Sequence, residues 1–235
     1  MSLCLPTSGS ARCGGDWSRW HGPESIDDPN DRLTSRLSGW AGPAAQRRSV
    51  MRSERFNLQP HLVGELLELR PLSVDDWDGL FAAAADPMIW KLHPSHDRYK
   101  EDVFREYFLE ALASKGALVA VDRKTQKIIG SSRYFWYGPE PSELEIGWTF
   151  LARSHWGGDY NGEMKRLMLN HAFTFVSSVI FIVGTMNLRS RKAVEKIGGV
   201  LTDRRVKRTL HGNVVEHVVY QIHKFAISGH DDTVP

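Results

Sequence analysis

The chain shows two kinds of apolar spacing, a strand-like period of two and a helix-like period, and both become regular from Leu66 onward. The segment "ELLELRPL" alternates with a period of two, so it predicts a strand that Pro71 ends. Ser73 and the acidic residues after it predict the N-cap of a first helix. A second helix is predicted over residues 100–114, and the connection "DPMIWKLHP" separates the two helices.

The second half of the chain predicts more strands than helices. "ALVAVDRKTQKIIGSSRYFWYG" predicts a hairpin that turns at residues 122–126, and "ELEIGWTFLA" predicts the next strand. "VIFIVG" is apolar throughout, which is typical of a buried strand. A short helix is predicted over residues 188–197, followed by a glycine C-cap and a last hairpin around "HGN". The order βααβββαβαββ predicts one mixed α/β domain.

Between these strands, "HWGGDYNG" leads directly into an amphipathic helix. The N–H groups at such a helix start suit an anion, although glycines there can also serve only to turn the chain. A Walker A loop is excluded, because Gly157 and Gly162 are followed by Glu163 and Met164, and the pattern G-x-G-x-x-G is absent. The predicted inward face consists of Met164, Leu167, Met168, His171, Ala172 and Phe175, and the predicted outward face of Glu163, Lys165, Arg166 and Asn170.

The segment "NLRSRKAVEKIGG" places polar side chains at one end of the next helix. Asn187 is predicted to cap that helix with its side-chain oxygen. Ser190 falls on the inward face, where a hydroxyl needs a partner. That partner is either a backbone carbonyl one turn earlier or a ligand.

Composition and charge narrow the class of protein. Residues 1–55 are rich in small, polar and charged residues and predict a flexible arm before a domain over residues 56–226, with a polar tail at 227–235. Met51 is an alternative translation start. A net charge of +2 disfavours a nucleic-acid or membrane-surface partner, and no apolar run approaches the roughly 20 residues of a membrane span. The only two cysteines, Cys4 and Cys13, lie in the arm, which fits a reducing cytoplasm.

These motifs, in this order, resemble the GNAT superfamily of acyl-CoA N-acyltransferases. "EIGW", a Trp-Gly turn into a helix, and N-x-x-S-x-x-A-x-x-K-x-G-G carry the resemblance, which is closest to the ribosomal-protein N-terminal acetyltransferases. Trp156, Gly157 and Tyr160 match that branch, but Asp159 replaces a glycine and Asn161 an alanine. The resemblance implies a single GNAT-like α/β domain with a mixed sheet of about six to seven strands. It also implies a splay, a divergence of the two central strands, that holds acyl-CoA.

Acetyl-CoA is therefore the expected co-substrate, with its pyrophosphate on residues 155–162 and its pantetheine along residues 149–151. The implied binding residues are Thr149, Phe150, Leu151, His155, Trp156, Gly157, Gly158, Asp159, Tyr160, Asn161, Gly162, Asn187 and Ser190. Asp159 is expected to point to solvent, or to be offset by Arg153, Lys165 or Arg166.

The resemblance also implies direct attack of a neutral amine on the thioester, with Glu145 as the candidate base and Ser190 as the candidate donor to the leaving thiolate. Strand alternation places Glu145 with Gly147 and Thr149, opposite Leu144, Ile146 and Trp148. A solvated strand carboxylate is the alternative for Glu145. Trp90 and His93 are predicted substrate contacts, since this superfamily shapes its acceptor site in that region.

The remaining features leave several alternatives. His93 and His96 lack further ligands, so no metal site is predicted. The basic residues 204–208 predict a solvated face, or a contact with an anion. The acceptor is a protein N-terminus or a small-molecule amine, and a homodimer is one option for the assembly. A non-catalytic acyl-CoA-binding module is the main rival to the enzyme, and a nucleic-acid-binding protein is disfavoured by the charge.

Overall fold

The computed structural model describes residues 56–136, 143–210 and 213–224, all of which fall in one compact unit. The predicted arm at 1–55, the alternative start Met51, the tail at 227–235 and the turn at 211–212 lie outside the described residues. In the described part of the chain, no helix is long and apolar enough to cross a membrane.

One mixed sheet organises the domain, with strand order β1-β2-β3-β4-β5-β6-β8-β7. Neighbouring strands run antiparallel except β5 and β6, which are parallel. The described strands number eight rather than the predicted six to seven, because the two residues of β1 are too few to show alternation. The strands are β1 (Leu62–Val63), β2 (Leu67–Pro71), β3 (Ala117–Asp122), β4 (Ile128–Trp136), β5 (Glu143–Leu151), β6 (Ser178–Gly184), β7 (Val200–Leu210) and β8 (Asn213–His223).

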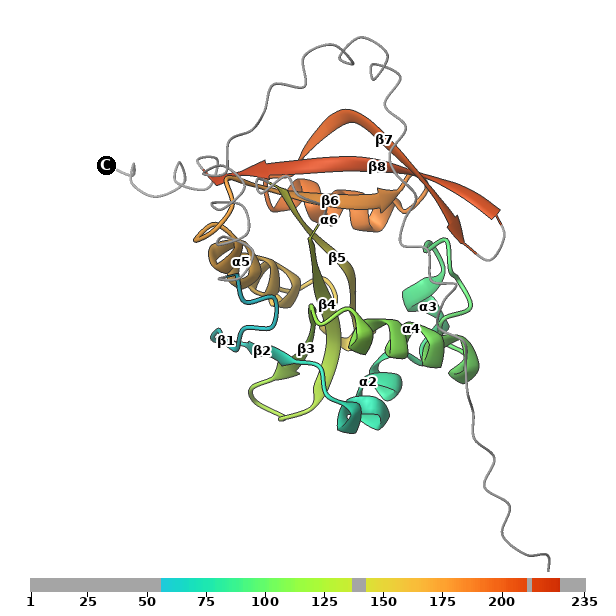
Figure 1. The fold of residues 1–235 in the computed structure, drawn as a ribbon. Helices are drawn as coiled ribbons and strands as arrows, with labels where there is room; N and C mark the ends of the chain where they lie inside the picture. The colour runs from blue at the N-terminus through green and yellow to red at the C-terminus, as the bar shows by residue number, and fades with distance from the viewer. Residues whose placement is uncertain (1–55, 137–142, 211–212, 225–235) are drawn as a thin grey trace, which may run out of the picture. The chain divides into compact units, whose positions relative to one another are not determined.

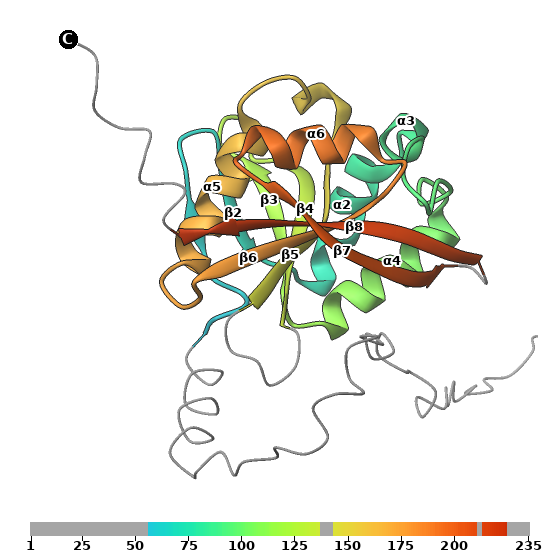
Figure 2. The same cartoon turned by 90° about the horizontal axis from the view of Figure 1, so that it is seen from above.

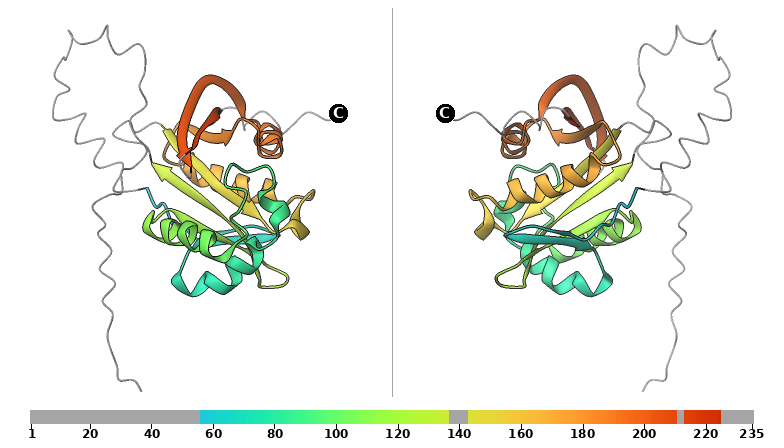
Figure 3. Two further views of the ribbon diagram at one scale, coloured as in Figure 1. Left: turned by 90° about the vertical axis from the view of Figure 1, so that its right-hand side faces the viewer. Right: turned by 90° about the vertical axis from the view of Figure 1, so that its left-hand side faces the viewer.

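Helices cover both faces of this sheet (Figures 1 and 3). One core lies between the sheet and α5, and Val194 of α6 joins it. A second core packs α2, α3 and α4 on the other face. Seen from above in Figure 2, α6 lies beside the β6 and β8 strands. The helices are α2 (Trp77–Ala84), α3 (Pro87–Trp90), α4 (Glu101–Ala113), α5 (Tyr160–Ala172) and α6 (Leu188–Lys196), with single 3₁₀ turns at Val74–Asp76 and Arg153–His155.

Local capping explains where the first helices begin. Ser73 forms the predicted cap, since its hydroxyl accepts from the Asp75 N–H and its own N–H donates to Asp76. The cap starts a 3₁₀ turn, and α2 follows at Trp77. The connection "DPMIWKLHP" contains the short helix α3, which was not predicted although Asp86 caps it and Pro87 begins it.

The predicted outward face of α5 is wrong at two positions. Glu163 and Lys165 are buried, with 7% and 4% of their surface exposed. The Glu163 carboxylate accepts hydrogen bonds from the backbone N–H groups of Leu66 and Leu67 at 2.8 and 3.1 Å. The carboxylate therefore provides the hydrogen-bond acceptor for the backbone N–H groups at the start of β2. Helical periodicity does not reveal this role, because the donors lie on another element.

Candidate active site

The two central strands separate and leave a cavity between them. β5 and β6 pair only where Glu143–Glu145 faces Ser178–Ile180, and they diverge beyond that point, as the splay requires. The cavity has a volume of about 660 Å³. Its lining includes most of the predicted site residues: Trp90, His93, Glu145, Thr149, Phe150, Leu151, His155, Trp156, Gly157, Gly158, Asp159, Asn161, Gly162, Asn187 and Ser190.

Tyr160 is the predicted site residue that does not line the cavity. Its hydroxyl donates to Asp122 Oδ2 at 2.5 Å, and its ring packs edge-on against His155 at 4.7 Å. This bond lowers the pKa of Asp122 to about 2. Tyr160 therefore fastens the start of α5 to the end of β3.

A β-bulge in β5 changes which side chains face the cavity. Arg133 pairs with Gly147, but Ser131 pairs with Phe150, so β5 contains one residue more than β4 in this interval. Trp148 lies in the bulge and has a φ of 50°. The predicted alternation is therefore wrong beyond Gly147: Trp148 packs in the α4-side core, and Thr149 turns toward α5.

Glu145 is a buried carboxylate inside the cavity, with only 1% of its surface exposed. Its Oε2 forms a salt bridge with Arg208 Nη2 at 3.0 Å. A Cβ atom added at Gly147 would lie 2.8 Å from Glu145 Oε1, so the glycine leaves room for the carboxylate. The solvated alternative for Glu145 does not fit this burial.

The basic segment of β7 is only partly the solvated face that the sequence predicts. Arg204 is exposed and pairs with Glu143 at 2.8 Å, whereas Arg208 lines the cavity beside Glu145. Regular alternation would place two residues four positions apart on one face, but the pairing of β7 with β8 shifts register between Leu201 and Arg205, which separates the two side chains.

Lys165 is a buried ammonium group in the cavity wall that the sequence pattern did not reveal. Its Nζ donates to Ser132 Oγ at 3.0 Å and to Thr149 Oγ1 at 2.5 Å, and it lies 5.6 Å from the Phe181 ring. Burial lowers the pKa of this lysine to about 7. Lys165 thus connects α5 to the bulge, where Thr149 sits.

The loop before α5 is open on the side of its glycines. Gly157 has a φ of 76°, and no atom lies within 4 Å of a Cβ built at Gly157, Gly158 or Gly162. Asp159 is exposed, as predicted, and forms no ion pair within the described residues. The cations proposed to offset it are engaged elsewhere: Arg153 with Asp86, Arg166 with Glu163, and Lys165 with the two hydroxyls.

The start of α6 forms the opposite wall. Asn187 is buried, and its Oδ1 accepts from the Ser190 N–H at 3.3 Å, which confirms the predicted cap. Ser190 is half-buried, and its hydroxyl makes no hydrogen bond to another described residue. Arg189 stacks over Trp156 at 4.1 Å and donates to the Ile89 carbonyl, so it connects α6, the loop and α3.

Trp90 and His93 close the end of the cavity next to α3. Trp90 is buried and donates its indole N–H to the Ala84 carbonyl at 2.8 Å. His93 Nδ1 accepts from the Ser95 N–H at 2.9 Å, and burial together with Arg98 lowers the pKa of His93 to about 3. The ring is therefore neutral at physiological pH. No group of three His, Cys, Asp or Glu side chains suited to a metal ion occurs among the described residues.

Comparison with known proteins agrees with this architecture. A family model for the acetyltransferase (GNAT) domain matches residues 67–200, more than half of the chain. Among solved structures, the acetyltransferase from Agrobacterium tumefaciens C58 is 26% identical, with coverage of 70% of this chain and 95% of that one and a TM-score of 0.55. No curated protein sequence matches the chain.

Two more distant structures share the fold. A GCN5-related N-acetyltransferase from Brucella melitensis is 17% identical, with coverage of 72% and 80% and a TM-score of 0.61. Mycobacterium smegmatis RimJ in complex with CoA-disulfide is 18% identical, with coverage of 68% and 82% and a TM-score of 0.53. The family match, over a chain that has the splayed strands and the glycine turn into α5, shows that this protein belongs to the GNAT acetyltransferase family.

Proposed function

We propose that the protein transfers an acetyl group from acetyl-CoA to a primary amine by direct attack within a ternary complex. One observation carries the proposal: a buried carboxylate, Glu145, stands inside the splay at the point where β5 and β6 separate. A general base is needed there because only a neutral amine attacks a thioester.

The residues present fit acetyl-CoA. The open glycines and the start of α5 leave backbone N–H groups available to a pyrophosphate, with the positive end of the helix dipole behind them. Residues 149–151 lie beyond the last β5–β6 pair, so their unpaired edge suits a pantetheine arm bound like an added strand. The related RimJ fold was solved with a CoA-disulfide, which supports this assignment.

The chemistry then rests on groups of this chain. Glu145 accepts the proton of the amine, directly or through a water molecule, while Arg208 keeps the carboxylate oriented. A backbone N–H of the bulged strand polarises the thioester carbonyl. Ser190, whose hydroxyl is not used by another described residue, donates to the leaving sulfur. Asn187 holds the start of α6 so that Ser190 faces the cavity.

The experiment is a release assay for free CoA with the full-length protein, acetyl-CoA and a panel of amines and N-terminal peptides, with products identified by mass. Turnover with an amine and a mass increase of one acetyl group support the proposal. Calorimetric binding of acetyl-CoA without turnover on any acceptor would overturn it and favour a non-catalytic acyl-CoA-binding module. Peptide acceptors in the panel test the ribosomal-protein N-terminus as a substrate.

A further inference from the structure

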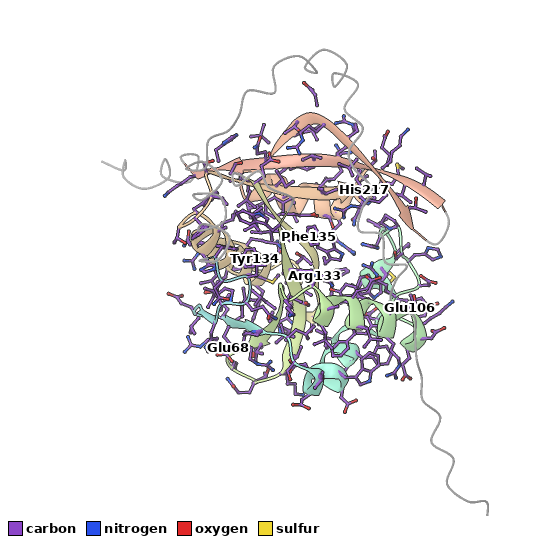
Figure 4. All side chains as sticks on the ribbon, in the orientation of Figure 1. Glu68, Glu106, Arg133, Tyr134, Phe135 and His217 are labelled. Carbon is purple, nitrogen blue, oxygen red and sulfur yellow. The ribbon has the colours of Figure 1, made fainter. Side chains whose placement is uncertain are left out.

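Hydrogen-bond donors without a matching acceptor gather on the α4 side of the sheet. Arg133, Tyr134 and Phe135 follow one another on β4 and are labelled in Figure 4. Tyr134 points toward α5 and donates its hydroxyl to the Met168 carbonyl. Arg133 and Phe135 therefore project from the other face, the one that carries Glu145.

Arg133 is the most exceptional of these donors. Only 4% of its surface is exposed, and its Nε and Nη2 atoms are buried without a hydrogen-bond partner. Its guanidinium lies 4.8 Å from the Trp148 ring and 5.7 Å from the Tyr107 ring. Cation–π contacts offset part of the burial cost of this charge, but they leave its N–H groups unsatisfied.

Arg98 and His93 add donors near the same Tyr107 ring. The Arg98 guanidinium lies 4.8 Å from the Tyr107 ring, and its Nη1 lies 3.5 Å from His93 Nε2. Because His93 Nδ1 accepts from the Ser95 N–H, the hydrogen of this neutral ring is on Nε2. Arg98 Nη1 and His93 Nε2 are thus two donors side by side, and one anion oxygen could accept a hydrogen bond from each.

The carboxylates near these guanidinium groups do not neutralise them. Glu145 is paired with Arg208, and Glu110 is exposed on α4. Neither Arg98 nor Arg133 forms a salt bridge within the described residues. Burial lowers the pKa of both arginines: Arg133 is buried, and Arg98 is half-buried in the cavity wall. A buried charge of this kind is costly until an anion pairs with it.

We propose that the acceptor is a compact amine carrying an anionic group, a carboxylate or a phosphate, which binds Arg98 in the cavity wall, with the buried charge of Arg133 close by, while its nitrogen faces Glu145. This inference rests on the proposed acetyl transfer. Arg133 pairs in register with Gly147, and Glu145 is two residues along the same strand on the same face. Such diagonal positions are roughly 7–8 Å apart, so a small molecule such as an α-amino acid reaches both.

Matched pairs of acceptors test the class of substrate. α-Amino acids are compared with their α-carboxamides, and phosphoethanolamine with ethanolamine, in the CoA-release assay with full-length protein. The proposal expects the anionic member of one pair to have at least about tenfold higher kcat/KM. The two pairs distinguish a carboxylate from a phosphate.

Two variants assign that preference to the arginines. Arg98→Gln and Arg133→Met are each expected to lower kcat/KM for the anionic acceptor by about 10- to 100-fold and to change it little for the neutral one. Arg105→Gln, on the outer surface of α4, is the matched control. Acetyl-CoA affinity, measured by calorimetry, and the thermal midpoint show whether each variant is folded. If Arg133→Met does not fold, the comparison of anionic and neutral acceptors with the wild-type protein still tests the proposal.

The outcomes separate this inference from the proposed function. Acetylation of neutral amines or peptides with no preference for the anionic partner overturns the anion site but leaves acetyl transfer intact. An absence of turnover on every acceptor overturns acetyl transfer itself. A preference for malonyl-CoA over acetyl-CoA that is lost in Arg133→Met would place the anion on the donor and would also overturn the inference.

Discussion

Glu145 and Lys165 are two ionisable side chains that the same cavity buries in different ways. Glu145 has a guanidinium partner, so its negative charge is stabilised in place. Within the described residues, Lys165 contacts two hydroxyls and the Phe181 ring but no carboxylate, and burial lowers its pKa. The ion pair suits Glu145 to the role of a base, which must be ionised before it accepts a proton. The environment of Lys165 suits a positioning residue whose charge state changes near neutral pH.

Glu145→Gln is expected to lower kcat by about 10²-fold or more, which is the usual contribution of a general base. The amide oxygen can still accept from Arg208, so acetyl-CoA affinity should stay within about twofold. Steady-state kinetics and calorimetry measure the two effects. Glu143→Gln, on the same strand but outside the cavity, is the control. A loss of less than threefold in kcat would exclude Glu145 as the base.

The lowered pKa of Lys165 predicts a dependence of stability on pH. Between about pH 7 and the unfolded pKa near 10.5, the unfolded chain holds a proton that the folded chain has released, so the free energy of unfolding rises with pH. Below pH 7 both states are protonated and this contribution is constant. Relative to Lys165→Met, the wild type should therefore gain up to about 1 kcal/mol per pH unit above pH 7.

Urea unfolding at pH 6, 7, 8 and 9 measures this difference, because subtracting the variant removes the contribution of other titrating groups. Lys124→Met, an exposed lysine in the β3–β4 turn, should show no such slope. A difference between the wild type and Lys165→Met that stays flat from pH 7 to 9 would mean that the folded lysine keeps its proton.

At the scale of elements, the bulge in β5 and the loop before α5 control the shape of the site. Because of the bulge, Thr149 contacts Lys165 on the α5 side of the sheet and Trp148 contacts Arg133 on the α4 side. One extra residue in β5 therefore decides which side chains reach the cavity from each face. The loop contributes three open glycines to the cavity lining. Cofactor affinity is therefore expected to depend mainly on backbone groups.

Asp159→Gly tests that expectation directly. Because Asp159 is exposed, its replacement should change the dissociation constant of acetyl-CoA by less than tenfold in calorimetry. Asp159→Asn separates the charge from the added backbone freedom of glycine. Tighter binding by more than tenfold in both variants would show that the native carboxylate opposes the phosphates.

At the scale of the whole molecule, the first described residues of the chain pack against the core of the domain. Phe56 has 8% of its surface exposed and packs within 5.0–6.0 Å of the rings of Tyr134, Trp136, His171 and Phe175. The Asn57 carbonyl lies 2.8 Å from His171 Nε2. Phe56 thus belongs to the folded core, and the boundary predicted at residue 56 stays a prediction.

A pair of truncations tests this boundary. Removal of residues 1–50 should leave the free energy of unfolding within about 1 kcal/mol of the full chain, because their composition favours no packed core. Removal of residues 1–60 should cost about 3 kcal/mol or more, as for the loss of a buried phenylalanine. Denaturant unfolding and acetyl-CoA binding are the measurements. A comparable loss in the shorter truncation would show that the arm stabilises the domain.

Local signals predicted most of the secondary structure. The Ser73 cap, the Asn187 cap, the apolar run of β6 and the glycines after α6 depend on residues close in sequence, and each was found. β1 and α3 were missed because two to four residues do not establish a period. Glu163 and Lys165 were placed wrongly because their partners lie on other elements, about 100 and 16 to 33 residues away.

The sequence by itself determined the mixed α/β domain, the GNAT resemblance and a set of site residues most of which line the cavity, because motif spacing and periodicity are local properties of a chain. Only the tertiary structure decided that Arg208 meets Glu145, that Lys165 enters the cavity wall, and that Arg98 and Arg133 converge near Tyr107. The Arg208–Glu145 pair depends on the register of β7, and the Lys165–Thr149 contact depends on the bulge in β5. A shift of a single residue reverses the face of a side chain, so these contacts are fixed by the packing of the sheet.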